Sequence, residues 1–183
     1  MAQRWAWAEV DLQALRRNVE AIVANTTTHS VWAVVKADAY GHGAVECARV
    51  ALDSGAIGLC VALVDEGVAL RRAGIAAPIL VMSEQPPEQH RQLVSNGLIA
   101  TVYNSESIVS LAATAAEMNI ACSVHLKVDT GMHRVGVSPS DAVARAQEVL
   151  SNPWLSLDGV YSHLATADDA SHNDLTEIGR AHV

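Results

Sequence analysis

Lys36 is the first residue whose position suggests chemistry, because it directly follows the apolar run 31–35 (VWAVV). Burial at the end of a strand lowers the pKa of a lysine, and the neutral amine can then form a Schiff base with an aldehyde cofactor. Gly41 and Gly43 follow closely and allow a tight turn beside a ligand. The alternative is a lysine that extends toward solvent and pairs with Asp38.

A second group of polar side chains lies in and after the run 123–128 (SVHLKV). Alternation along a strand puts His125, Lys127 and Asp129 on one face, and three polar residues in register predict a cavity lining. Arg134 follows in the next loop, where a guanidinium can bind a carboxylate or a phosphate through two hydrogen bonds. The alternative makes Arg134 a structural partner of Asp129.

His163 closes the run 159–163 (GVYSH). A histidine at a strand end can stack on a planar ring or act as an acid or base, although many such residues are purely structural. Lys36, Lys127 with Arg134, and His163 all fall at or just after the carboxyl ends of predicted strands. The active face of a barrel lies at that end of its strands, so the sequence predicts one shared site.

The elements that would position these residues are short apolar runs that alternate with helical segments. The runs are 31–35, 57–62, 78–82, 98–102, 123–128 and 159–163, and the predicted helices are 12–23, 44–54, 65–73, 87–95, 105–118 and 139–150. This alternation indicates a single α/β domain with a parallel sheet, either doubly wound or a barrel. Periodicity does not choose between the two, and no GxGxxG fingerprint follows the first run.

Length and charge exclude several functional classes. A complete (β/α)₈ barrel takes about 250 residues, so 183 residues allow only part of one. The net charge of −8 argues against a protein that binds nucleic acid or anionic membranes, and no apolar run is long enough to span a bilayer. Three cysteines without a CxxC pair suggest a reducing, cytoplasmic setting. No ligand spacing for a metal is evident.

Three segments together resemble the alanine racemase family. They are VKADAYGHG at 35–43, KVDTGMHRVG at 127–136 and SHLATAD at 162–168, and WAEVDL at 7–12 fits the start of the same family. The resemblance runs in order from about residue 4 to about residue 176, and the first two motifs in combination are highly specific. It implies an incomplete TIM-type (β/α)₈ barrel with about six of its eight βα units.

The resemblance also implies a cofactor and roles for individual residues. Lys36 would hold pyridoxal 5′-phosphate covalently and act as the base on one face of the substrate α-carbon. Tyr40 would help to hold the cofactor phosphate, and Arg134 would lie near the cofactor phenolic oxygen and the substrate carboxylate. Lys127 would be the lysine that is often carbamylated, and His163 would pack near the pyridine ring. The implied reaction interconverts L- and D-alanine for cell-wall peptidoglycan precursors.

The family pattern implies more than these residues supply. Members continue through two further strands into a C-terminal β domain and act as homodimers, in which the partner subunit contributes a tyrosine as the opposite base. We therefore expect 1–177 to be a truncated barrel domain, inactive alone, and 178–183 to be a non-family tail that matches one reading frame of a sequencing adapter. The alternative function is a short, non-catalytic protein that binds pyridoxal phosphate.

Overall fold

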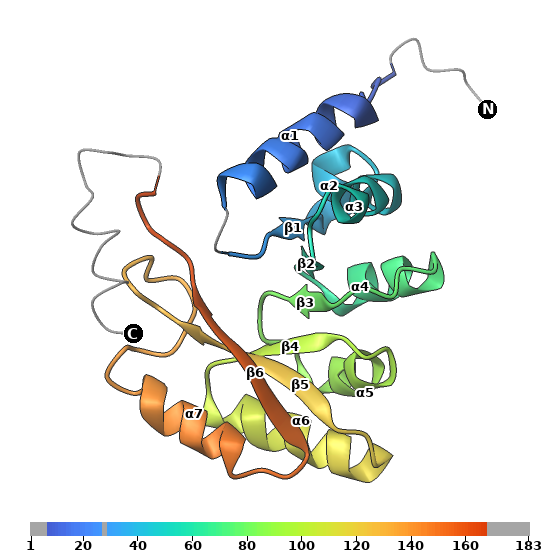
Figure 1. Ribbon diagram of the computed structural model, residues 1–183. Helices are drawn as coiled ribbons and strands as arrows, with labels where there is room; N and C mark the ends of the chain where they lie inside the picture. Colours follow the sequence, from blue (N-terminus) through green and yellow to red (C-terminus); the bar gives the residue numbers. More distant parts are fainter. Residues whose placement is uncertain (1–6, 27–28, 168–183) are drawn as a thin grey trace.

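Six parallel strands form one sheet in the computed structural model, which describes residues 7–26 and 29–167 (Figure 1). The strands lie side by side in the order in which they occur along the chain. Their bounds are β1 Trp32–Val34, β2 Gly58–Val61, β3 Ile79–Val81, β4 Ile99–Val102, β5 Cys122–Val128 and β6 Leu155–Ser162. Because a doubly wound sheet reverses its strand order and a barrel does not, the unbroken order identifies a barrel arrangement.

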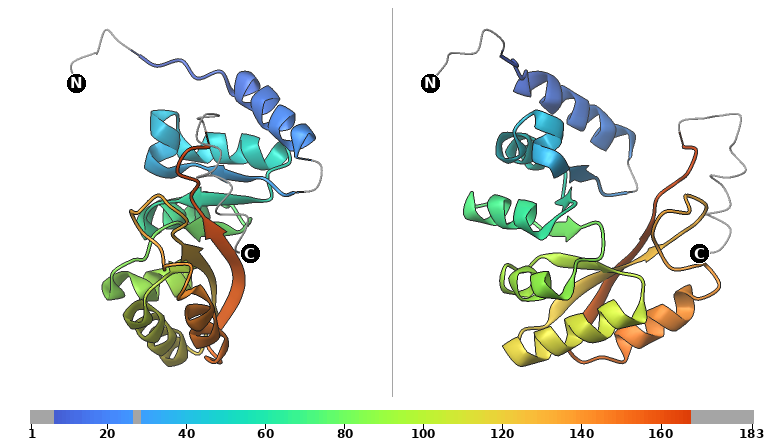
Figure 2. Two further views of the ribbon diagram at one scale, coloured as in Figure 1. Left: turned by 90° about the vertical axis from the view of Figure 1, so that its left-hand side faces the viewer. Right: turned by 180° about the vertical axis from the view of Figure 1, so that it is seen from behind.

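Helices connect successive strands and cover one face of the sheet (Figure 2). Each crossover returns the chain to the same end of the sheet, as parallel pairing requires. The helices are α1 Leu12–Asn25, α2 Lys36–Gly41, α3 Ala44–Asp53, α4 Val64–Arg72, α5 Pro87–Ser95, α6 Ser105–Met118 and α7 Ala142–Leu150. Within the described residues no helix has the length and apolar character needed to cross a membrane.

Side chains from distant strands meet on the face opposite the helices. The rings of Trp32 on β1 and His125 on β5 lie 5.9 Å apart, although three strands separate β1 from β5 in the sheet. The Tyr161 hydroxyl of β6 likewise donates a hydrogen bond of 2.9 Å to the carbonyl of Met82, just after β3. Such contacts require a strongly curved sheet. The expected partial TIM-type barrel is thereby confirmed.

The main core lies between the sheet and its helices. Every residue of β2 and β3 is buried, which explains their continuous apolar sequences, whereas β6 alternates between less and more exposed residues. Local signals begin the helices: Asp11 accepts hydrogen bonds from two amides of α1, and Asn104 accepts one at the start of α6. The largest fully buried side chains include Leu59, Leu70, Ile79, Leu93, Leu98, Ile108, Leu111 and Leu126.

Two element boundaries expected from the sequence need correction. The last strand begins at Leu155 rather than at 159, because alternating residues from 155 onward pair with β5. The segment after Lys36, for which the sequence predicts only a tight turn, forms the short helix α2. Helix α7 also begins at Ala142 instead of 139. The expected boundary between 177 and 178 lies outside the described residues.

Candidate active site

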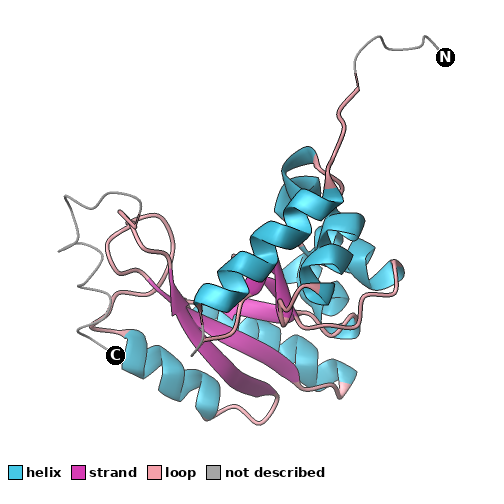
Figure 3. Cartoon of the chain, turned by 45° about the horizontal axis from the view of Figure 1, so that its top comes forward, coloured by secondary structure: helices cyan, strands magenta, loops and turns pink. Residues whose placement is uncertain are grey.

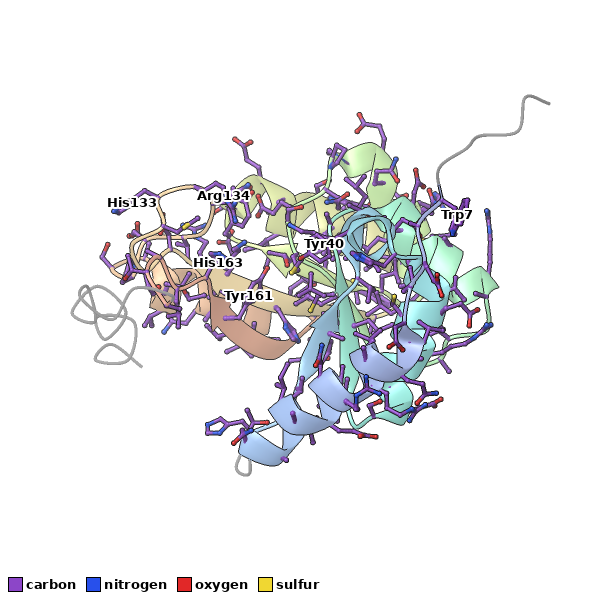
Figure 4. All side chains as sticks on the ribbon, turned by 90° about the horizontal axis from the view of Figure 1, so that it is seen from above. Trp7, Tyr40, His133, Arg134, Tyr161 and His163 are labelled. Carbon is purple, nitrogen blue, oxygen red and sulfur yellow. The ribbon has the colours of Figure 1, made fainter. Side chains whose placement is uncertain are left out.

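A cavity of about 410 Å³ opens at the carboxyl ends of the strands. The five residues to which the family resemblance gives a role all line it, namely Lys36, Tyr40, Lys127, Arg134 and His163. His125 and Asp129, which strand alternation also predicted to line a cavity with Lys127, are not among the described residues that line this one. Both lysines of the sequence are among them. Figure 4 shows Arg134 and His163 at one side of this mouth and Tyr40 nearer the middle.

Lys36 opens a left-handed turn. The four residues from Ala37 to Tyr40 have φ between 51° and 57°, and none of them is glycine. This conformation costs about 1–2 kcal/mol per residue for L-amino acids, so the surrounding contacts must hold it. The amide of Ala39 donates to the Val35 carbonyl at 3.0 Å, and the turn leaves Lys36 half-buried and Tyr40 61% exposed.

Lys127 is the most buried cation of the site, with 6% of its surface exposed. Its Nζ donates to the carbonyl of Met82 at 3.4 Å and lies 5.4 Å from the centroid of the Tyr161 ring. Burial lowers the pKa of Lys127, and the positive charges of Arg134 and Lys36 lower it further. Three mutually repelling cations at one mouth make the cavity suited to an anionic ligand.

The loop that carries Arg134 is pinned at its base. The Asp129 amide donates to the Val137 carbonyl at 2.8 Å, and the Val137 amide donates to the Lys127 carbonyl at 2.9 Å. These bonds close a loop between β5 and α7 (Figure 3). The exposed Arg134 side chain therefore projects from a fixed loop toward the cavity that it lines.

The two alternatives that paired these cations with nearby carboxylates do not hold. Asp38 accepts a hydrogen bond of 2.7 Å from the Ala44 amide instead of pairing with Lys36. Asp129 accepts from the amides of Gly131 and His133, and these bonds, the His133 amide foremost, lower its pKa. In the part of the chain that the structure describes, neither carboxylate forms an ion pair with the cation assigned to it.

Sequence reasoning missed Tyr161, which lies beneath the cavity. Its hydroxyl donates to Met82 and accepts from the Thr101 hydroxyl at 2.8 Å, and burial raises the pKa of Tyr161 to about 12. Tyr161 pairs with Lys127 in the β5–β6 register. Alternation along the predicted run 159–163 already puts Tyr161 on the same face as His163, and this signal could have indicated its position.

Sequence reasoning also missed Glu66, whose carboxylate accepts a hydrogen bond of 2.6 Å from the amide of Ala37, next to Lys36. A glutamate in the first turn of a helix is ordinarily a capping residue. Nothing in its sequence context distinguishes a contact 29 positions away.

Comparisons with known proteins agree with this geometry. Residues 10–182 match the family described as the N-terminal domain of alanine racemase. An alanine racemase of Desulfovibrio desulfuricans is 41% identical over 170 residues, which is 92% of this chain. The crystal structure of an alanine racemase from Bacillus anthracis with bound L-Ala-P matches the whole chain with a TM-score of 0.89 and 34% identity.

A histidine racemase from Leuconostoc mesenteroides shares the same fold, with a TM-score of 0.86 and 31% identity over 93% of the chain. The chain spans about half the length of these relatives: 46% of the Desulfovibrio protein, 47% of the Bacillus chain and 46% of the histidine racemase.

Proposed function

Because the chain belongs to the family of alanine racemase N-terminal domains, we propose that it carries the lysine-bearing part of an alanine racemase active site. The reaction is the interconversion of L- and D-alanine with pyridoxal 5′-phosphate, which would serve cell-wall peptidoglycan synthesis. The observation that carries this proposal is the convergence of Lys36, Lys127 and Arg134 on one cavity.

The donor set fits pyridoxal phosphate. The cofactor has an aldehyde that a lysine amine can bind and a phosphate that needs positive charge or hydrogen-bond donors nearby. Lys36 offers the amine, and Tyr40 on the same turn offers a hydroxyl at the rim of the cavity. Arg134 and Lys127 add positive charge, and the nearest carboxylate in their loop, Asp129, is already bonded to backbone amides.

The chain's own residues have distinct tasks in this proposal. Lys36 holds the cofactor and then, as a free amine, takes or returns the α-proton on one face of the substrate. Arg134 binds and orients the substrate carboxylate, and His163 packs near the cofactor ring. When bound, pyridoxal phosphate supplies an electron sink that stabilises the negative charge developing at the α-carbon.

Lys127 has a separate role, which we propose to be carbamylation. Burial and two neighbouring cations lower its pKa, so the neutral amine is more abundant than in an ordinary lysine. That nitrogen can attack carbon dioxide, forming an N–C bond and releasing one proton. The new carboxylate would convert a repelling cation into a partner for Arg134, with which Lys127 shares a small cluster.

Inversion of the α-carbon requires a second acid–base group, because an amine on one side of a carbon reaches only one face. The family resemblance implies a tyrosine from the partner subunit of a homodimer, and we propose the same assembly for the complete protein. The substrate is proposed to be alanine, as the names of the alanine racemase relatives suggest. The histidine racemase relative has the same fold and is named for a different substrate.

Two further points support this proposal. The relatives are racemases, so they do not favour the alternative of a short, non-catalytic protein that binds pyridoxal phosphate. The three cysteines, Cys47, Cys60 and Cys122, are buried free thiols. Free thiols are typical of reducing compartments, and we propose the cytoplasm as the site of action.

A racemisation assay tests the function. The chain is joined to the C-terminal half of the Bacillus anthracis relative, and conversion of L-alanine to D-alanine is measured with pyridoxal phosphate. We expect turnover that is lost in both Lys36→Ala and Lys36→Arg, since arginine keeps the charge but cannot bind the aldehyde. Turnover that survives in both variants would overturn the proposal.

A further inference from the structure

Glu66 joins two neighbouring loops at the mouth of the sheet. Its Oε1 accepts a hydrogen bond of 2.6 Å from the amide of Ala37, which directly follows Lys36. Its Oε2 accepts from the amides of Ala62 and Leu63, at 2.7 and 3.0 Å, in the loop between β2 and α4. One carboxylate thus ties the turn after β1 to the loop after β2.

Capping explains only half of this arrangement. Glu66 lies in the first turn of α4, and its bond to the amide of Leu63 is the return bond of a capping box. The cap occupies Oε2 alone and gives no reason for Oε1 to face Ala37. Hydrogen bonds to a charged acceptor are among the stronger ones in proteins, so the contact with Ala37 has structural consequences of its own.

The turn that receives this bond is intrinsically unfavourable. All four residues from 37 to 40 adopt the left-handed conformation, and none of them is a glycine. The exit of the turn is fixed by Asp38, whose carboxylate accepts from the amide of Ala44 at 2.7 Å. Glu66 fixes its entrance, at the residue next to Lys36. A carboxylate therefore holds each end of a segment that would otherwise relax.

We propose that Glu66 is a positioning residue that holds this left-handed turn and so directs the Lys36 amine into the cavity. The inference rests on the proposed function, because the direction of Lys36 matters for chemistry only if its amine binds the cofactor. Glu66 acts through the backbone of Ala37 and takes no part in proton transfer.

A second carboxylate shows what is specific to Glu66. Glu84, after β3, accepts from the amides of Tyr103 and Asn104 after β4, so it also ties adjacent loops together. Neither of those amides is next to a lysine. Loss of Glu84 should loosen the mouth without changing the aim of Lys36, which makes it a control for general destabilisation.

The test uses the 183-residue chain with Glu66→Ala and Glu66→Gln, the matched control Asp65→Ala, and Glu84→Ala as the control for general loosening. Asp65 is an acidic neighbour in the same turn of α4, and its carboxylate accepts from Gln92 of α5. Asp65→Ala thus removes the same charge near the same helix end. Glu66→Gln keeps one acceptor oxygen, and it replaces the alanine variant in the test if that variant does not fold.

Two readouts are measured. The first is hydrogen exchange of the Ala37 amide, which we expect to be about tenfold faster or more in Glu66→Ala and unchanged in Asp65→Ala. The second is the rate at which Lys36 binds pyridoxal phosphate. Binding condenses the amine with the aldehyde and releases one water; borohydride then reduces the C=N bond, and peptide mass spectrometry locates the label. We expect this rate to fall about tenfold in Glu66→Ala and less in Glu66→Gln.

The outcomes separate this inference from the proposed function. If the wild-type chain is labelled at Lys36 and Glu66→Ala is labelled as fast, the positioning role is wrong and the proposed function stands. If Glu84→Ala slows labelling as much as Glu66→Ala, the effect is general loosening and the positioning role is again wrong. If the wild-type chain is not labelled at Lys36, the proposed function fails and the inference fails with it.

Discussion

Substitutions at two glycines in the loop that carries Arg134 can distinguish the stability cost of backbone strain from that of a steric clash. Gly131 and Gly136 have the same φ of +132°, a conformation that L-residues rarely adopt. A Cβ added at Gly131 would meet nothing within 4 Å, whereas one at Gly136 would lie 2.6 Å from the Asp129 nitrogen. Changing either glycine to alanine therefore strains the backbone at the same unfavourable φ, and only Gly136→Ala adds a clash with the backbone.

The magnitudes follow from the bonds at the base of this loop. The shared backbone strain costs roughly 1–3 kcal/mol. The clash at Gly136 also displaces Asp129, whose amide bonds to the Val137 carbonyl, and threatens the return bond from Val137 to Lys127. Each of these is worth about 1 kcal/mol net, so Gly136→Ala should lose about 2 kcal/mol more than Gly131→Ala.

Thermal unfolding followed by circular dichroism measures this difference. For a chain of this size about 2–4 °C accompanies each kcal/mol, so the Tm of Gly136→Ala should lie about 4–8 °C below that of Gly131→Ala. Equal Tm values for the two variants would refute the reasoning, because they would show that the loop absorbs the clash and that its base does not hold Arg134 in place.

Three further predictions concern buried polar groups. Tyr161→Phe removes the hydrogen-bond partner of the Thr101 hydroxyl, on a residue only 2% exposed, and should lower the free energy of unfolding by about 1–3 kcal/mol. Adding Thr101→Val removes the unpaired hydroxyl and should recover part of that loss. Denaturant titrations measure both changes, and strictly additive effects in the double mutant would contradict this prediction. Burial lowers the pKa of His90 below 6.5, so the unfolded chain binds the proton more readily and stability should fall as the pH drops below about 6.5. His90→Gln should flatten that dependence in urea titrations, and an unchanged slope would count against it. Burial raises the pKa of Cys60 to about 11 and that of Cys122 to about 12. A thiol reagent at pH 8 should therefore label the two cysteines only as fast as the chain unfolds. Rapid labelling of the folded chain would disprove their burial.

The sequence predicted the elements well wherever the hydrophobic pattern was continuous. Strands β2 and β3 are buried on both faces, and their apolar runs were found within one residue at each end. Strand β6 was predicted four residues short, because its alternating half-exposed sequence from Leu155 resembles a loop until β5 is placed beside it. Edge strands with one open face carry a weaker signal than central strands.

The residues that line the candidate site could be predicted from the sequence, but the residues that hold them in position could not. Lys36, Lys127 and His163 lie near strand ends, and parallel strands bring those ends together, so their sequence positions indicated a common cavity. The supports, Glu66 and Tyr161, act through contacts with residues 29 to 79 positions away. Long-range hydrogen bonds of this kind leave no periodic trace in a sequence.

The left-handed turn after Lys36 was also beyond sequence reasoning. Gly41 indicated a change in chain direction, but local propensity argues against left-handed φ values at Ala37 and Tyr40. Tertiary contacts at both ends of the turn override that propensity.

The attachment site of pyridoxal phosphate tests the central claim most directly. The chain is incubated with pyridoxal phosphate, reduced with borohydride, digested and mapped by mass spectrometry. Because the sequence holds only two lysines, the competing side chains are Lys36 and Lys127. The structure predicts a label at Lys36 that is absent from Lys36→Ala. A label confined to Lys127 or the N-terminal amine, with Lys36 unmodified, would contradict the assignment of this cavity as the cofactor site.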